Sequence, residues 1–129
     1  MDDRDNRPDI ACVCGSTRFK DEYLELHKQL TLAGIVYVSV GFFGHQERIE
    51  PTPIEKAVLD ALHMYKVQMS DYLVIVDIDG YIGESTAKEI EYGKLLGKQV
   101  YYWSNEDELF FKHTLDMAGR KGIVSETPF

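Results

Sequence analysis

The sequence predicts a doubly wound α/β fold, in which a parallel sheet of four to five strands carries helices on both faces. Two observations support this prediction. Short apolar segments alternate with longer segments whose apolar residues recur at helical spacing. The short segments are apolar at nearly every position, as in strands that are covered on both faces. Right-handed crossovers make such a sheet doubly wound, and for four strands we expect the order 2-1-3-4, a flavodoxin- or Rossmann-like arrangement.

The apolar segments define the strands, expected at residues 10–14, 35–40, 72–79 and 99–103. Helices are expected at residues 19–33, 53–69, 87–96 and 107–119. Thr52 and Glu55 form a capping-box pattern around Pro53, which marks the start of the second helix. No repeat or linker interrupts the chain, so we expect one domain at 1–129, with a flexible start at 1–9 and a C-terminal tail at 120–129.

The chain carries 22 acidic and 14 basic residues, which gives a formal net charge of −8. This balance argues against binding to duplex nucleic acid or to an anionic membrane, because both require a basic face. No apolar run reaches the roughly 20 residues of a membrane span, and the charged first residues do not resemble a signal peptide. We therefore expect a cytoplasmic protein that binds neither duplex nucleic acid nor membranes.

Cys12 and Cys14 are the two cysteines of the chain, and they lie on the same face of the first predicted strand. Neither a second cysteine pair nor a histidine at zinc-finger spacing accompanies them. The sequence therefore predicts reduced thiols in the core rather than a metal site.

The strand order places the loops that leave the first and third strands side by side, where a doubly wound fold binds its ligands. The first loop carries Gly15, Ser16, Thr17 and Arg18. The glycine allows a close approach of the backbone, while the hydroxyls, the free amides of the next helix and the guanidinium can all donate hydrogen bonds. These groups predict a phosphate site. The alternative is a helix cap beside an exposed arginine.

The second loop carries Asp77, Asp79 and Tyr81. The two carboxylates are candidates for proton transfer, sugar binding or Mg²⁺ binding, with loop capping as the alternative. The tyrosine is a candidate for stacking on a base or sugar, with a role as an apolar loop anchor as the alternative.

Glu89 has two interpretations. Its spacing from Thr86 favours a capping box, and the alternative is a nucleophile that its helix presents to the cleft. His63 and Lys66, one turn apart on the second predicted helix, could also face this cleft, although a packed or surface histidine is the commoner arrangement.

Three motifs carry a resemblance to a known family: CGSTRF at residues 14–19, SDYLVIVD at residues 70–77 and GESTAKEIEYGKLLGKQV at residues 83–100. With these motifs in this order, the chain resembles the nucleoside 2-deoxyribosyltransferase-like superfamily, and within it the 2'-deoxynucleoside 5'-phosphate N-hydrolases. The resemblance implies phosphate binding by Ser16 and Arg18 and a nucleophilic role for Glu89. It also implies that the small and hydroxyl residues before the glutamate lie near the sugar and phosphate, namely Gly83, Ser85 and Thr86.

The transferases of this family carry an Asp-Ser-Gly-Thr segment before the glutamate, whereas this chain has Gly83-Glu84-Ser85-Thr86. The missing aspartate leaves its sugar and proton-transfer contacts to Asp77, Asp79 or Tyr81. The resemblance implies an enzyme that hydrolyses the base–sugar bond of a nucleoside 5'-monophosphate through a covalent glycosyl-glutamate, without a metal or other cofactor.

Two alternatives stay open, a nucleoside 2-deoxyribosyltransferase that acts on free nucleosides and a nucleotide-binding or sensing module without turnover. Because members of the family form oligomers, the resemblance also implies a homo-oligomer.

Overall fold

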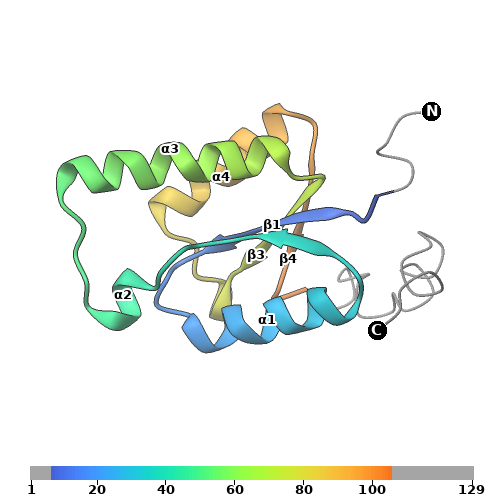
Figure 1. Ribbon diagram of the computed structural model, residues 1–129, viewed down its shortest axis with the longest axis horizontal. Coiled ribbons are helices and arrows are strands. Elements are labelled where there is room, and N and C mark those ends of the chain that lie inside the picture. The colour runs from blue at the N-terminus through green and yellow to red at the C-terminus, as the bar shows by residue number, and fades with distance from the viewer. Residues whose placement is uncertain (1–6, 106–129) are drawn as a thin grey trace.

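The computed structural model describes residues 7–105, and its architecture confirms the predicted fold class (Figure 1). Four parallel strands form one sheet in the predicted order β2-β1-β3-β4. The strands are β1 (Ile10–Gly15), β2 (Val36–Val38), β3 (Tyr72–Val76) and β4 (Gln99–Tyr102). The central strands β1 and β3 are neighbours, so the loops that leave them begin side by side. The helix expected at 107–119 and the tail at 120–129 lie outside the described residues.

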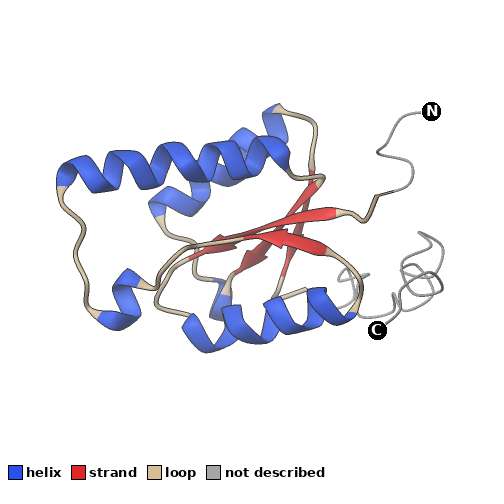
Figure 2. Ribbon diagram, viewed as in Figure 1, coloured by secondary structure: helices blue, strands red, loops and turns tan. Residues whose placement is uncertain are grey.

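Helices cover both faces of this sheet (Figure 2). One face carries α1 (Lys20–Leu32), and the other carries α3 (Pro53–Met69) and α4 (Glu84–Leu95). Side chains of β1 alternate between two buried clusters: Ala11 and Val13 belong to the cluster of α1, whereas Cys12 and Cys14 belong to that of α3 and α4. Burial on both faces explains why the strands are apolar at consecutive positions. Among residues 7–105, no helix is long and apolar enough to cross a membrane.

The helix α3 begins as its sequence predicts. Thr52 is the N-cap and accepts a hydrogen bond from the Glu55 amide at 3.2 Å, while the Glu55 carboxylate accepts one from the Thr52 amide at 2.9 Å. A short helix, α2 (Gly44–Glu47), forms before it, where no element was expected. Phe43 is buried against the core, and its amide donates to the Glu47 carboxylate at 3.3 Å. Phe43 therefore anchors the start of this segment in the core.

The capping box expected at Thr86 and Glu89 is wrong. The helix α4 begins at Glu84, three residues earlier than predicted, with Gly83 as an extended N-cap and no side-chain cap. Its first helical hydrogen bond runs from the Ala87 amide to the Gly83 carbonyl at 2.9 Å. Glu89 therefore lies inside the helix, faces the core and is only 8% exposed.

Residues 7–9, expected to be flexible, are hydrogen-bonded to the sheet. Arg7 donates to both carboxylate oxygens of Asp71 at 2.7 and 2.9 Å, and the Ile10 amide donates to the same carboxylate. The Asp9 carbonyl accepts from the Val36 amide at 2.9 Å. The hydrogen bonds from Arg7 hold the pKa of Asp71 below its ordinary value, against partial burial, with help from the Ile10 amide. These contacts fix the start of β1.

Candidate functional site

The two loops at the carboxyl ends of β1 and β3 contact each other, as the switch-point rule predicts. Arg18 Nη2 donates to the Tyr81 hydroxyl at 3.2 Å, and the guanidinium carbon lies 4.4 Å from the centroid of the Tyr81 ring. The Phe19 ring packs edge-on against Tyr81, with centroids 6.0 Å apart. An arginine and two aromatic rings thus bridge the central strands.

The first loop holds Arg18 in place through its own backbone and Ser16. The Arg18 amide and Nε both donate to Ser16 Oγ, at 3.3 and 3.0 Å. The Gly15 carbonyl accepts from the hydroxyl of Tyr23 at 2.8 Å, which ties the loop to α1. Thr17, the third residue of the predicted phosphate loop, is half-buried between Ser16 and Arg18. Ser16 and Arg18 are therefore oriented before any ligand binds.

The N-terminus of α4 lies beside this loop. A Cβ atom placed on Gly83, the N-cap, would come 3.5 Å from the Tyr81 hydroxyl. No side chain caps the helix, and its first amides carry the positive end of the helix dipole. Ser85 is exposed in this first turn, whereas Thr86 is buried. Together with Arg18, this helix end makes a neighbourhood suited to an anion.

The two aspartates of the second loop have different surroundings. Asp77 is buried, and its carboxylate oxygens accept from the amide and the hydroxyl of Ser104 at 2.9 and 2.6 Å. It thus caps the turn that follows β4, which is the alternative role that the sequence left open. Asp79 is exposed on a short 3₁₀ turn with φ 55°, a left-handed conformation. Of the two carboxylates, Asp79 is the one that faces solvent.

Glu89 on α4 meets His63 on α3. Glu89 Oε2 lies 2.5 Å from His63 Nε2, and the side chains are 11% and 13% exposed. The contact is an ion pair without an aligned hydrogen bond to that oxygen, so the carboxylate keeps unused acceptor capacity. Burial lowers the pKa of His63, but the contacts with Cys12 and Glu89 outweigh burial and raise it to about 9. These two contacts favour the charged form of His63.

The same histidine contacts both cysteines. His63 Nε2 lies 3.4 Å from Cys14 Sγ and 3.9 Å from Cys12 Sγ, and the sulfur atoms are 3.8 Å apart. Both cysteines are fully buried and unbonded to each other, as the sequence predicts. The hydrogen bond from Cys14, opposed by burial and supported by His63, lowers the pKa of Cys12 to about 6. The same thiol–thiol contact and burial raise the pKa of Cys14 well above its ordinary value.

The sequence spacing did not reveal this cluster, because its members come from three elements. The signal that could have found His63 is Val67, which follows it by one helical turn and is fully buried against the sheet. Placing that apolar face of α3 on the Cys12–Cys14 face of β1 brings His63 to the thiols. Lys66, its neighbour on α3, instead donates to the Ser39 carbonyl.

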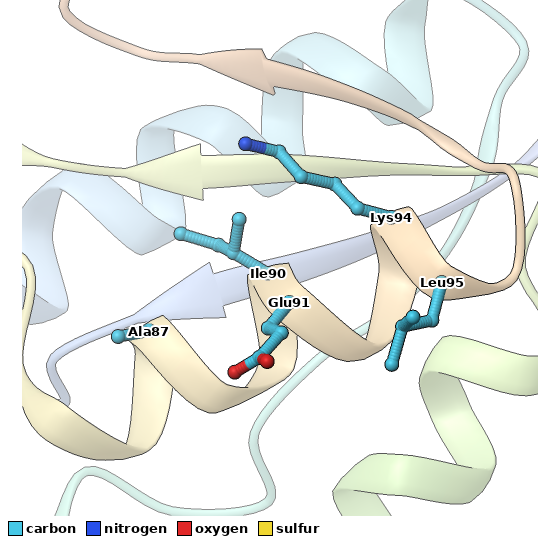
Figure 3. Close-up of a pocket in the computed structure, with 5 residues that line it drawn as sticks. All are labelled: Ala87, Ile90, Glu91, Lys94 and Leu95. Carbon is cyan, nitrogen blue, oxygen red and sulfur yellow. The ribbon is translucent and has the colours of Figure 1, made fainter.

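A shallow pocket runs along one side of α4, and neither the two cysteines nor His63 lines it (Figure 3). Its lining residues all belong to that helix: Ala87, Ile90, Glu91, Lys94 and Leu95. Neither Arg18 nor Glu89 lines it, so it adds no group to the candidate site.

The chain matches no protein-family model, no curated protein and no solved structure. The geometry of the site therefore carries the functional proposal.

Proposed function

We propose that this protein is an N-glycosidase that hydrolyses the base–sugar bond of a nucleoside 5'-monophosphate. The observation that carries the proposal is the contact of Arg18 with Tyr81, whose hydroxyl lies beside Gly83, the N-cap of the helix α4 that bears Glu89. One helix thus offers an anion-binding end and, farther along its inner face, a carboxylate. A nucleotide presents the matching pair, a phosphate and an electrophilic anomeric carbon. The resemblance to the 2'-deoxynucleoside 5'-phosphate N-hydrolases supports the same assignment.

The phosphate would be held by Arg18, by Ser16 and by the first amides of α4, with the hydroxyls of Ser85 and Thr86 nearby. An incoming phosphate competes with Tyr81 for Arg18, because the guanidinium now donates to the tyrosine hydroxyl. Binding would therefore release the Tyr81 ring from Arg18 and free it to pack on the sugar or base. Binding energy gained at the phosphate would position the reacting carbon.

In the proposed reaction a Glu89 oxygen bonds to the anomeric carbon while the carbon–nitrogen bond breaks. The base leaves with the electron pair of that bond and takes up a proton. Water then attacks the glycosyl ester, which frees the sugar phosphate and restores the carboxylate. His63 acts as a positioning residue, since its Nε2 atom lies 2.5 Å from Glu89 Oε2 and fixes the place of the carboxylate on the inner face of α4. Because Asp77 is taken up by Ser104, Asp79 and Tyr81 are the candidates for donating the proton to the base.

The second candidate is a nucleotide-binding or sensing module without turnover. The burial of Glu89 favours this binding module. Its side chain is 11% exposed and paired with His63, so a sugar can reach it only after the residues that cover it move. In this case the phosphate site would be the same, and Glu89 would be a structural member of the core cluster.

Incubation with a panel of nucleoside and deoxynucleoside monophosphates, followed by chromatography of the released base, separates the candidates. We expect base release by the wild type and loss of at least about 1000-fold in rate for Glu89→Gln, which keeps the side-chain shape but removes the nucleophile. Saturable binding without released base would establish the binding module instead. A free acceptor base added to the reaction tests the third possibility, since a transferase would form a new nucleoside with it.

Arg18→Met tests the phosphate assignment, with Lys88→Met as the matched control on an exposed cation of α4. Losing a charge-assisted hydrogen bond of about 1.5–3 kcal/mol should raise KM for the monophosphate about 10–100-fold. KM for the corresponding free nucleoside should change little, and Lys88→Met should change neither value. An equal loss for both substrates would contradict phosphate recognition by Arg18.

We also propose that the protein is a homo-oligomer, because α3 exposes a stripe of large apolar side chains. Its members recur at intervals of three or four residues and are 48–79% exposed: Ile54, Val58, Leu62, Tyr65 and Met69. A second copy that contributes the same stripe would cover it by symmetric helix packing. Leu62→Glu should dissociate the oligomer in sedimentation experiments. Leu24→Glu is the matched control, because Leu24 on α1 has the same exposed fraction of 48%; a monomeric wild type would refute the proposal.

A further inference from the structure

The inner face of α3 and α4 brings together four side chains that can bind a metal ion. Cys12 and Cys14 come from β1, His63 from α3 and Glu89 from α4. The two thiols and the imidazole each offer one ligand atom, and these three atoms all lie within 4.8 Å of one another. The fourth, Glu89 Oε2, is 2.5 Å from His63 Nε2.

The separations between these atoms are close to those in a tetrahedral zinc site. Bond lengths of about 2.3 Å to sulfur and about 2.05 Å to nitrogen place two tetrahedral sulfur ligands about 3.8 Å apart, and a sulfur and a nitrogen about 3.6 Å apart. The Cys12–Cys14 sulfur separation is 3.8 Å, and His63 Nε2 lies 3.4 and 3.9 Å from the two sulfurs. Three of the four corners of a tetrahedron are therefore already in place.

Glu89 is the candidate for the fourth corner, because it contacts the same imidazole nitrogen. A tetrahedral nitrogen and oxygen lie about 3.3 Å apart, so the carboxylate needs to move about 0.8 Å away from His63. Its Oε2 atom has no aligned hydrogen bond that such a movement would break. Two thiolates and one carboxylate also offset the charge of a divalent cation in a buried site, which an uncompensated ion could not occupy.

We propose that Cys12, Cys14, His63 and Glu89 form a binding site for a thiolate-preferring divalent cation, with Zn²⁺ as the best match. Sulfur and imidazole ligands select zinc over Mg²⁺ or Ca²⁺, which take oxygen ligands. Binding requires both cysteines as thiolates and an unprotonated His63 Nε2, so any protons that these groups carry are released to solvent. The site stands on this geometry and does not require the glycosidase proposal.

Two other uses of the cluster fit its geometry less well. A nucleophilic cysteine needs access to its substrate, and both cysteines are 0% exposed. A catalytic triad would use the two imidazole nitrogens for the thiol and the carboxylate, whereas here Nε2 alone meets Cys12, Cys14 and Glu89. The thiol and imidazole ligand atoms instead lie within 4.8 Å of one another, and the carboxylate meets the same imidazole nitrogen. This clustering suits ligands that share one metal ion.

The test is a titration of the full-length reduced chain with Co²⁺, which reports ligand type and geometry by absorption. We expect one Co²⁺ per chain, strong visible bands of tetrahedral cobalt and a near-ultraviolet thiolate-to-cobalt band. Cys12 and Cys14 are the only cysteines of the chain, so that band can arise from no other residues. Zn²⁺ should displace the cobalt and abolish the spectrum. Failure to bind, or the weak spectrum of octahedral cobalt without a thiolate band, would overturn the proposal.

Cys14→Ala should weaken Co²⁺ binding by more than the roughly 10–100-fold that losing an outer-sphere partner causes. The matched control is Val13→Ala, which truncates a fully buried neighbour on the opposite face of the same strand and should leave Co²⁺ affinity unchanged. Equal affinities in the two variants would place the metal elsewhere. Should both variants fail to fold, the wild-type thiolate band still decides. Because no nucleotide is present, failure here is distinct from failure of the proposed enzymatic function.

Discussion

Replacement of Gly15 by alanine should destabilise the protein by about 2–5 kcal/mol, through backbone strain and a clash with β3. Gly15 lies at the end of β1, beside the candidate site. Its φ of 149° is rarely adopted by L-residues and contributes about 1–2 kcal/mol of strain after substitution. The added methyl group would lie 2.7 Å from the Val76 carbonyl oxygen. Gly15 and Val76 are paired in the sheet, so relief of that clash requires the strands to part, at about 1–3 kcal/mol.

Urea unfolding measures this loss, with circular dichroism and the fluorescence of Trp103, the single tryptophan, as two independent signals. Gly80→Ala is the matched control. Gly80 has a φ of 77°, but nothing lies within 4 Å of the position of its added methyl group. It should show the strain alone, about 1–2 kcal/mol. If Gly15→Ala were no more destabilising than Gly80→Ala, the close approach of β1 and β3 at the switch point would be refuted.

Three further outcomes are expected. Ser104→Ala should lower the free energy of unfolding by about 1.5–3 kcal/mol, because the buried Asp77 carboxylate loses a hydrogen-bond donor. If Asp77 is only a cap, the KM for nucleotides should not change. A raised KM would indicate that Asp77 contributes to the candidate site. The urea midpoint should fall as pH drops below about 4, because the depressed pKa of Asp71 adds stability only while that carboxylate is ionised; Asp71→Asn should flatten this dependence. Tyr23→Phe should cost about 1–3 kcal/mol in urea unfolding by leaving the Gly15 carbonyl without its hydroxyl donor, and an unchanged midpoint would show that water replaces it.

The fold was predictable because its strands carry an unambiguous pattern. Consecutive apolar residues at 10–14 and 72–76 require cover on both faces, and a parallel sheet with crossover helices supplies it. The α3 start was predictable for a local reason, since Thr52, Pro53 and Glu55 satisfy the first amides of that helix by themselves. Both predictions depend on interactions within one element or between adjacent strands.

The candidate site was predictable only in part, because some of its contacts depend on how helices pack. The neighbouring positions of the loops that bear Arg18 and Tyr81 follow from strand order, whereas the contact between the two side chains does not. The start of α4 does not follow from spacing. Two residues that are three positions apart, such as Thr86 and Glu89, can form a capping box at the start of a helix or lie about one turn apart inside it, and here they lie inside it. His63 reaches the core cluster through the packing of α3 on the sheet, which no spacing along the chain encodes.

The two proposals assign Glu89 to states that exclude each other, and this gives a measurable link between them. A carboxylate that ligates a cation cannot also bond to an anomeric carbon, so metal and substrate should compete if the sugar reaches Glu89. Thermodynamic linkage then requires a nucleoside monophosphate to weaken Zn²⁺ binding by the same factor by which Zn²⁺ weakens nucleotide binding. A module that holds only the phosphate, at Arg18 and the start of α4, would leave Glu89 untouched and the two affinities independent. Titrating Co²⁺ with and without saturating nucleotide measures that factor: reciprocal weakening would show the sugar at Glu89, whereas its absence would confine the ligand to the rim and contradict the enzymatic role.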